Sequence, residues 1–60
     1  MTYEQARQIK PGERLRTVYG ETGTVQSHQD TGWSRIFVLQ LDRNHRCVPV
    51  HNDKCFPVEG

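Results

Sequence analysis

The sequence predicts a mainly-β domain in which five short strands close into a small barrel behind a short N-terminal helix. After residue 10, short runs rich in Val, Ile, Phe, Tyr and Thr alternate with turns containing Gly, Pro, Asn and Asp. Five closely spaced short strands of this kind are typical of a small barrel. A chain of 60 residues has room for one domain, so we assign residues 1–10 to the helix and residues 12–58 to the barrel.

The composition predicts a thin hydrophobic core. Hydrophobic residues make up 33% of the chain, a low share for a globular domain. Domains this small commonly gain stability from a metal, a disulfide or a partner subunit. We therefore expect oligomerisation to be a possible source of stability.

The N-terminal residues predict a two-turn helix over 2–9. Thr2 and Gln5 have the spacing of a capping box, and Glu4 suits the positive end of a helix dipole. The segment 10–12, Lys-Pro-Gly, ends the helix because proline disfavours helical geometry in the residue before it.

The first two strands are predicted at 13–19 and 24–28. Leu15 and Thr17 should face inward, and Gly20 and Gly23 should supply turn positions between the strands. A polar loop over 29–32 follows the second strand.

The third strand, 35–42, is apolar on both faces. Its predicted inward residues are Phe37, Leu39 and Leu41, and its predicted outward residues are Ile36 and Val38. A strand with one face in water normally alternates apolar with polar residues, so the outward face needs a cover. The helix, through Ala6 and Ile9, or another subunit is the expected cover.

The remaining strands are predicted at 46–50 and 56–58. Pro49 cannot donate a ladder hydrogen bond, which indicates an edge position or a bulge. The polar segment 51–54 suits a single 3₁₀ turn.

A framework of glycines and apolar residues resembles KOW-type segments, which belong to the SH3-like barrel group. The residues that carry the resemblance are Gly12, Leu15, Thr17, Gly20, Gly23 and Val25. The resemblance covers roughly residues 10–42. It implies binding to RNA or to ribosomal and transcription proteins through the first inter-strand loop and neighbouring basic residues.

The residues themselves give a first hypothesis, in which the protein contacts RNA or single-stranded DNA through arginines and exposed aromatic rings. Outward arginines suit phosphates, and aromatic rings suit stacking with bases. The predicted contact residues are Arg14, Arg16, Tyr19, Trp33, Arg35, Arg43 and Arg46. The alternative is that these arginines are ordinary solvated side chains, because isolated surface charges are common, and that they are balanced by Glu13, Glu21, Asp30 and Asp42. With a net charge of only +1, an electrostatic contact must depend on a local basic patch.

Trp33 is the only tryptophan and follows Gly32 at the end of a predicted loop. A tryptophan there is either an exposed contact for a partner or a core residue that closes one end of the barrel.

A second hypothesis is a protein-interaction or homo-oligomerisation adaptor. In this hypothesis the partner binds the apolar outer face of strand 35–42, provided that the N-terminal helix does not cover this face.

Four residues of metal-ligating types fall close together near the C-terminus, namely His45, Cys47, His51 and Cys55. Their spacing matches no common zinc motif, so we predict neither metal nor cofactor. A bridge between Cys47 and Cys55 would need an oxidising environment and suitable geometry, so we expect free thiols.

No nucleophile has an evident base and orienting group, and we predict that the protein is not an enzyme. Plasmid-type dihydrofolate reductases are also tiny SH3-like barrels, which makes a small oligomeric reductase a remote alternative. Residues 48–51 lack the glutamine and tyrosine of that family's pore-lining strand. No run suits an export signal or a bilayer span, so we expect a cytoplasmic location.

Overall fold

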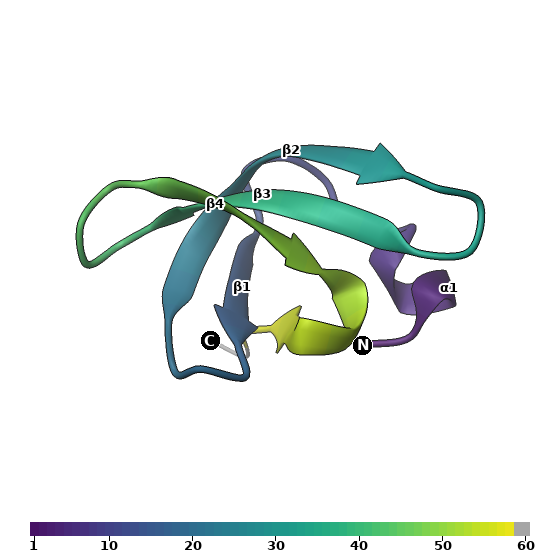
Figure 1. Ribbon diagram of the computed structural model, residues 1–60, viewed down its shortest axis with the longest axis horizontal. Helices are drawn as coiled ribbons and strands as arrows, with labels where there is room; N and C mark the ends of the chain where they lie inside the picture. The colour runs from purple at the N-terminus through teal and green to yellow at the C-terminus, as the bar shows by residue number, and fades with distance from the viewer. Residues whose placement is uncertain (59–60) are drawn as a thin grey trace.

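The computed structural model describes residues 1–58 and shows one antiparallel sheet of five strands with a short helix beside it (Figure 1). The elements are α1 (Tyr3–Ala6), β1 (Arg14–Thr17), β2 (Thr22–Asp30), β3 (Arg35–Leu41), β4 (Cys47–His51), the 3₁₀ helix η1 (Asn52–Lys54) and β5 (Cys55–Pro57). The strand order is β4-β3-β2-β1-β5. The predicted mainly-β class is confirmed, but the sheet is not closed because β4 and β5 form its two edges.

Strand β2 is the longest strand and joins the two halves of the sheet. Its first residues pair with β1, and nearly its whole length pairs with β3. The β2–β3 register shifts between Val25 and Ser27, and such a bulge lets a strand bend. The prediction that Gly23 lies in the turn is wrong, because this glycine is the second residue of β2. Gly20 does lie in the turn, with a φ of 84°.

The core lies on one side of the sheet. Its buried hydrophobic residues are Ala6, Ile9, Leu15, Val25, Phe37, Leu39, Leu41, Val50 and Cys55. The predicted inward positions in β1 and β3 are confirmed. Thr17 is buried, and its hydroxyl oxygen accepts hydrogen bonds from the backbone N–H groups of Tyr19 and Glu21, which stabilises the β1–β2 turn.

Helix α1 covers the core side of the sheet. Ala6 and Ile9 belong to the same cluster as the inward residues of β3. The expectation that these residues cover Ile36 and Val38 is therefore wrong, because the helix packs on the opposite face.

The predicted capping box of Thr2 and Gln5 is present, but the helix is one turn rather than two. The backbone N–H groups of Gln8 and Ile9 bond three residues back, so the chain leaves α-helical geometry after Ala6. The amino group of Met1 donates to the carbonyl oxygens of Asn52 and Cys55, which ties the start of the chain to η1 and β5.

Strand β4 is an edge strand, as Pro49 predicts. The predicted 3₁₀ turn is confirmed at Asn52–Lys54. No helix among residues 1–58 is long and apolar enough to span a membrane.

Candidate functional site

The predicted contact residues do not meet in one place. Trp33 lies in the β2–β3 loop, whereas Arg43 and Arg46 lie in or beside the β3–β4 loop at the other end of the molecule (Figure 1). The longest dimension of the fold is 30 Å. A single strip of arginines and aromatic rings is therefore not formed.

Two of the predicted arginines are held by carboxylates. Arg14 donates to both carboxylate oxygens of Asp42, and this contact raises the pKa of the Arg14 guanidinium. Arg43 pairs with Glu21 at 3.0 Å. A guanidinium that already has a carboxylate partner attracts a phosphate less strongly, so these residues contribute little to a basic surface.

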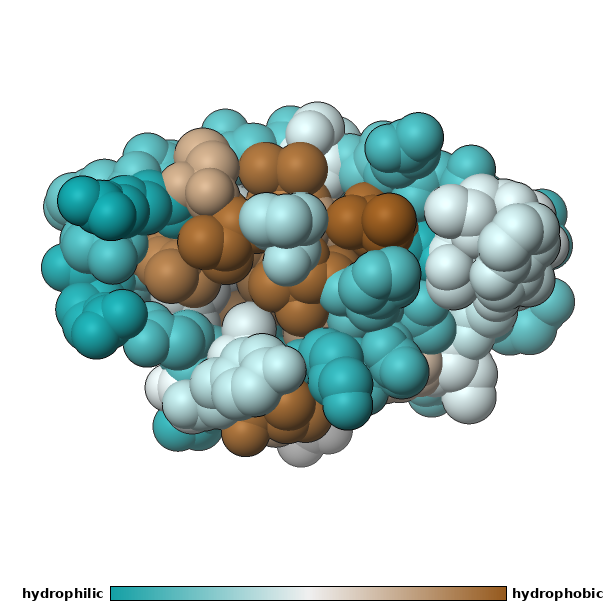
Figure 2. All heavy atoms as spheres, viewed as in Figure 1, coloured by the Kyte–Doolittle hydropathy of each residue, from teal (hydrophilic) through white to brown (hydrophobic). Residues whose placement is uncertain are grey.

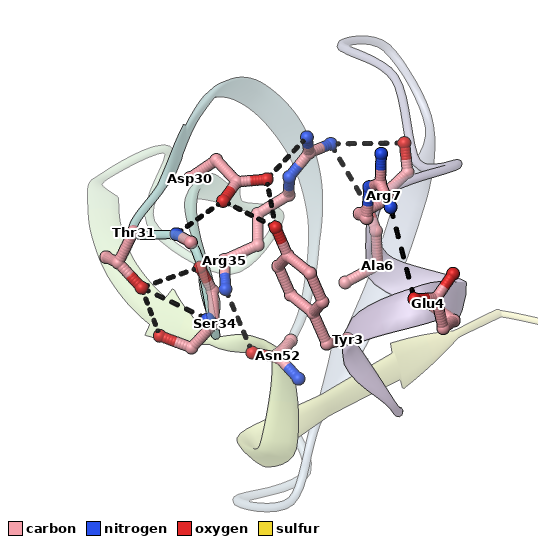
Figure 3. A network of polar contacts seen from close by, with 10 residues as sticks. Tyr3, Glu4, Ala6, Arg7, Asp30, Thr31, Ser34, Arg35 and Asn52 are labelled. Carbon is pink, nitrogen blue, oxygen red and sulfur yellow. Dashed lines mark hydrogen bonds and ion pairs between the residues drawn. The ribbon is translucent and has the colours of Figure 1, made fainter.

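Arg35 is a structural residue whose side chain is only 11% exposed. Its guanidinium donates at 3.3 Å to the carbonyl oxygens of Ala6 and Arg7, which lie at the C-terminal end of α1 (Figure 3). It also pairs with Asp30 at 3.2 Å. Arg35 thus fixes the helix to the β2–β3 hairpin, and its position does not favour the predicted contact with a partner.

Tyr3 and Asp30 complete this network, which sequence reasoning missed. The Tyr3 hydroxyl lies 2.7 and 2.8 Å from the two carboxylate oxygens of Asp30. This hydrogen bond is the main cause that lowers the pKa of Asp30, and the N–H of Gly32 and the guanidinium of Arg35 lower it further. The same bond raises the pKa of the Tyr3 hydroxyl.

The Asp30 carboxylate gives a testable pH dependence. Its pKa is lower in the folded than in the unfolded protein, so its contribution to stability is present above the unfolded value and is lost as the pH falls through the folded value. We expect Asp30→Asn to flatten the decrease in thermal midpoint between about pH 4 and pH 2. Asp53→Asn, a change at an exposed aspartate in η1, is the control and is measured over the same pH range.

The same loop displays Trp33, whose side chain is 79% exposed. The interpretation that Trp33 closes the core is therefore wrong. Four hydrogen bonds between Thr31 and Ser34 hold the loop, and the N–H of Gly32 donates to Asp30. The ring is thus presented from an ordered turn, and Tyr19 is similarly exposed at the β1–β2 turn.

The outer face of β2, β3 and β4 has no charged group. Directly paired residues of antiparallel strands share a face, so the register defines the members. They form three cross-strand rows: Ser27, Val38 and Pro49; Gln29, Ile36 and His51; and Thr24, Gln40 and Cys47, the last of which continues onto Arg14 of β1. In Figure 2 hydrophobic residues gather over β3 and β4, with hydrophilic residues around them. Ile36 and Val38 are only half-buried, and Pro49 is exposed.

A groove runs along β5 on another part of the surface. It is lined by Met1, Gln5, Arg16, Phe56, Pro57 and Val58 and has a volume of about 640 Å³. Arg16 lies directly opposite Phe56 in the β1–β5 pairing, and Phe56 is 44% exposed. Sequence reasoning identified Arg16 but missed Phe56, because only the pairing of two distant segments puts the ring beside the guanidinium.

The four histidines and cysteines considered as metal ligands are also separated. Cys47 is exposed on edge strand β4, whereas Cys55 is buried in the core, and burial raises the pKa of its thiol. Within residues 1–58, no three His, Cys, Asp or Glu side chains are grouped to hold a metal ion.

Comparisons of the chain with protein-family models, with curated proteins and with solved structures gave no significant match. The uncharged outer face and the groove along β5 are therefore the features of residues 1–58 that indicate function.

Proposed function

We propose that this protein is a noncatalytic protein-interaction module that binds a protein partner, either another protein or a second copy of itself, through the outer face of β2–β4. We further propose that its sheet is an SH3-like arrangement. The meander β1–β4, the pairing of β5 with β1 and the 3₁₀ turn between β4 and β5 support this fold assignment, as does the resemblance to KOW-type segments.

The observation that carries the proposal is the absence of charge on the outer face. Charged residues make up 25% of the chain, yet none of the nine residues that β2, β3 and β4 contribute to the three cross-strand rows is charged. The centre of a protein–protein interface is depleted in charged residues. The composition of this face therefore suits a protein surface better than the phosphates of a nucleic acid.

The exposure of the apolar residues supports the same proposal. Ile36 and Val38 lie at the centre of the face, and helix α1 packs on the other side of the sheet. Pro49 lacks an N–H group, so the free edge of β4 is a poor template for adding another strand. A partner would therefore pack on the face rather than extend the sheet.

Nucleic-acid binding is less well supported. A nucleic-acid surface needs several cations that lie near one another and are free to meet phosphates. Arg14, Arg35 and Arg43 are in ion pairs, and the net charge is only +1.

The test is photo-crosslinking in cells, with a photoreactive amino acid at Ser27 on the outer face and, as a control position, at Arg43. We expect Ser27 to capture a defined protein or a second copy, and Val38→Asp to reduce that capture at least about tenfold by placing a charge in the interface. Val18→Asp makes the same change at an exposed valine of the β1–β2 turn and should leave the capture intact.

Three results would contradict the proposal. They are equal labelling from Ser27 and Arg43, labelling that persists in a folded Val38→Asp variant, and crosslinks that nuclease treatment removes. Circular dichroism checks that the variants fold. If Val38→Asp does not fold, Pro49→Glu on the exposed edge strand carries the same test.

A further inference from the structure

The groove along β5 has chemical features that the outer face lacks. Four of its six lining residues are apolar, namely Met1, Phe56, Pro57 and Val58. The other two are the guanidinium of Arg16 and the amide of Gln5. The amide oxygen of Gln5 accepts the N–H of Thr2 in the capping box, so its NH₂ group is the part that remains for a ligand.

The charge of the groove is positive and localised. Among residues 1–58, Arg16 forms no ion pair, in contrast to Arg14 on the same strand, and no lining residue is acidic. A guanidinium next to apolar side chains binds a carboxylate through two parallel hydrogen bonds. The groove is thus complementary to one anionic group beside an apolar group.

The spacing of these features fits an extended peptide. Residues that face each other across paired strands lie about 5 Å apart, and diagonal neighbours lie about 7–8 Å apart. Arg16 is opposite Phe56, and Val58, whose N–H donates to the carbonyl oxygen of Arg14, is its diagonal neighbour. In an extended peptide, side chains two residues apart point to the same side and are separated by about 6.6 Å. Two side chains of a bound peptide that are two residues apart would therefore contact the apolar lining residues and Arg16 at the same time.

We propose that this groove binds an extended peptide segment with an apolar side chain and, two residues away, a carboxylate. The apolar side chain packs against Phe56 and Val58, and the carboxylate pairs with Arg16. A single-stranded nucleic acid is the less suitable ligand, because the amino group of Met1 already donates to two carbonyl oxygens, which leaves Arg16 as the main cation for a phosphate, and the lining is more aliphatic than aromatic. This site is separate from the outer face, so it stands or fails independently of the proposed function.

The experiment is a nuclear magnetic resonance titration of the ¹⁵N-labelled full chain. The probe is the peptide acetyl-Ala-Leu-Ala-Glu-Ala-amide, and two control peptides replace its Glu by Gln or its Leu by Ala. We expect saturable shifts at the amides of Gln5, Arg16 and Phe56. Replacing Glu by Gln should weaken binding about three- to tenfold, and replacing Leu by Ala about tenfold.

The decisive variant is Arg16→Gln. It should remove the preference for Glu over Gln and keep the preference for Leu over Ala. Arg46→Gln makes the same change in charge beside the β3–β4 loop and should retain both preferences. Arg16 is exposed on β1, so the variant is expected to fold, and its thermal midpoint is measured alongside.

Three outcomes would overturn the proposal. In the first, no peptide gives saturable shifts up to about 10 mM, a concentration that detects even the weakest specific binding. In the second, Arg16→Gln retains the wild-type ratio of affinities for the Glu and Gln peptides. In the third, an oligothymidylate shifts the groove amides with a steep salt dependence while the peptide does not, which would assign the groove to nucleic acid. Val38→Asp should leave peptide binding unchanged, which separates this test from that of the outer face.

Discussion

Gly23→Ala is expected to lower the thermal midpoint of unfolding by roughly 4–24 °C. An added Cβ at this position would lie 2.7 Å from the carbonyl oxygen of Gln40 and 3.3 Å from the Cβ of Leu39. The first contact is with backbone, so β2 and β3 must separate to admit a methyl group. Overpacking of this kind costs about 1–3 kcal/mol, and each kcal/mol lowers the midpoint of a small domain by roughly 4–8 °C.

The expected loss is large for this protein because its total stability is small. At about 0.05–0.15 kcal/mol per residue, a chain of this length has roughly 3–9 kcal/mol to lose. The matched control is Gly20→Asn. Gly20 has a φ of 84° but nothing within 4 Å of an added Cβ, and asparagine tolerates this conformation better than other residues do. If Gly23→Ala unfolds at the wild-type midpoint, or at a higher midpoint than Gly20→Asn, the approach of β2 to β3 does not exclude a larger residue at position 23.

Gly23 also shows why the turn was predicted incorrectly. In the sequence, Gly20 and Gly23 are equivalent turn residues, because each can adopt a positive φ. In the structure only Gly20 does so, whereas Gly23 is glycine because another strand approaches it closely. That strand is seventeen residues away along the chain at Gln40, so no local pattern distinguishes the two roles.

The predictions were correct for features that depend on a single strand or a single residue. Side chains of a strand alternate between its two faces, so Leu15 and Thr17 were predicted to face inward. In the structure these two residues are buried, and Arg14 and Arg16 are exposed. Pro49 marks the edge strand because a missing N–H is a property of the residue itself. These features need no knowledge of the partner strand.

The predicted contact surface was less accurate, because the role of an arginine depends on which acid the fold brings near it. Arg14 meets Asp42, which is twenty-eight residues away, and Arg43 meets Glu21 across another pair of segments. The exposed ring beside Arg16 is Phe56 rather than Tyr19 or Trp33, and this also depends on strand pairing. The sequence did identify the two-faced third strand, because its apolar outward residues are evident without tertiary information.

Arg35→Met is the second change with a large expected effect. The side chain is nearly buried, and its guanidinium bridges the end of α1 and the Asp30 carboxylate. Methionine keeps much of the apolar contact of the side chain but leaves the Asp30 carboxylate without its cationic partner. Breaking a partly buried charged network costs about 2–4 kcal/mol, so we expect a decrease of roughly 8–32 °C in the thermal midpoint.

The effect should begin at helix α1, because Arg35 is one of few residues that hold the helix to the sheet. Ala6 and Ile9 are buried in the core, so release of the helix would expose that end of the core to water. Amide hydrogen exchange is therefore expected to accelerate at Ala6, Arg7 and Gly32 more than at Leu39 in the centre of β3. This pattern distinguishes local release of α1 from a uniform loss of stability.

Arg43→Met is the matched control, since it removes an arginine with one ion pair on the surface. Exposed pairs of this kind contribute less than about 1 kcal/mol, so the variant should unfold within roughly 8 °C of the wild type. Arg35→Lys is a stricter comparison, because a single ammonium group cannot reproduce the planar fork that reaches two carbonyl oxygens and a carboxylate. If both Arg35 variants unfold with the same midpoint as Arg43→Met, the network beside Tyr3 does not hold the helix. In that case the packing of Ala6 and Ile9 alone accounts for its position.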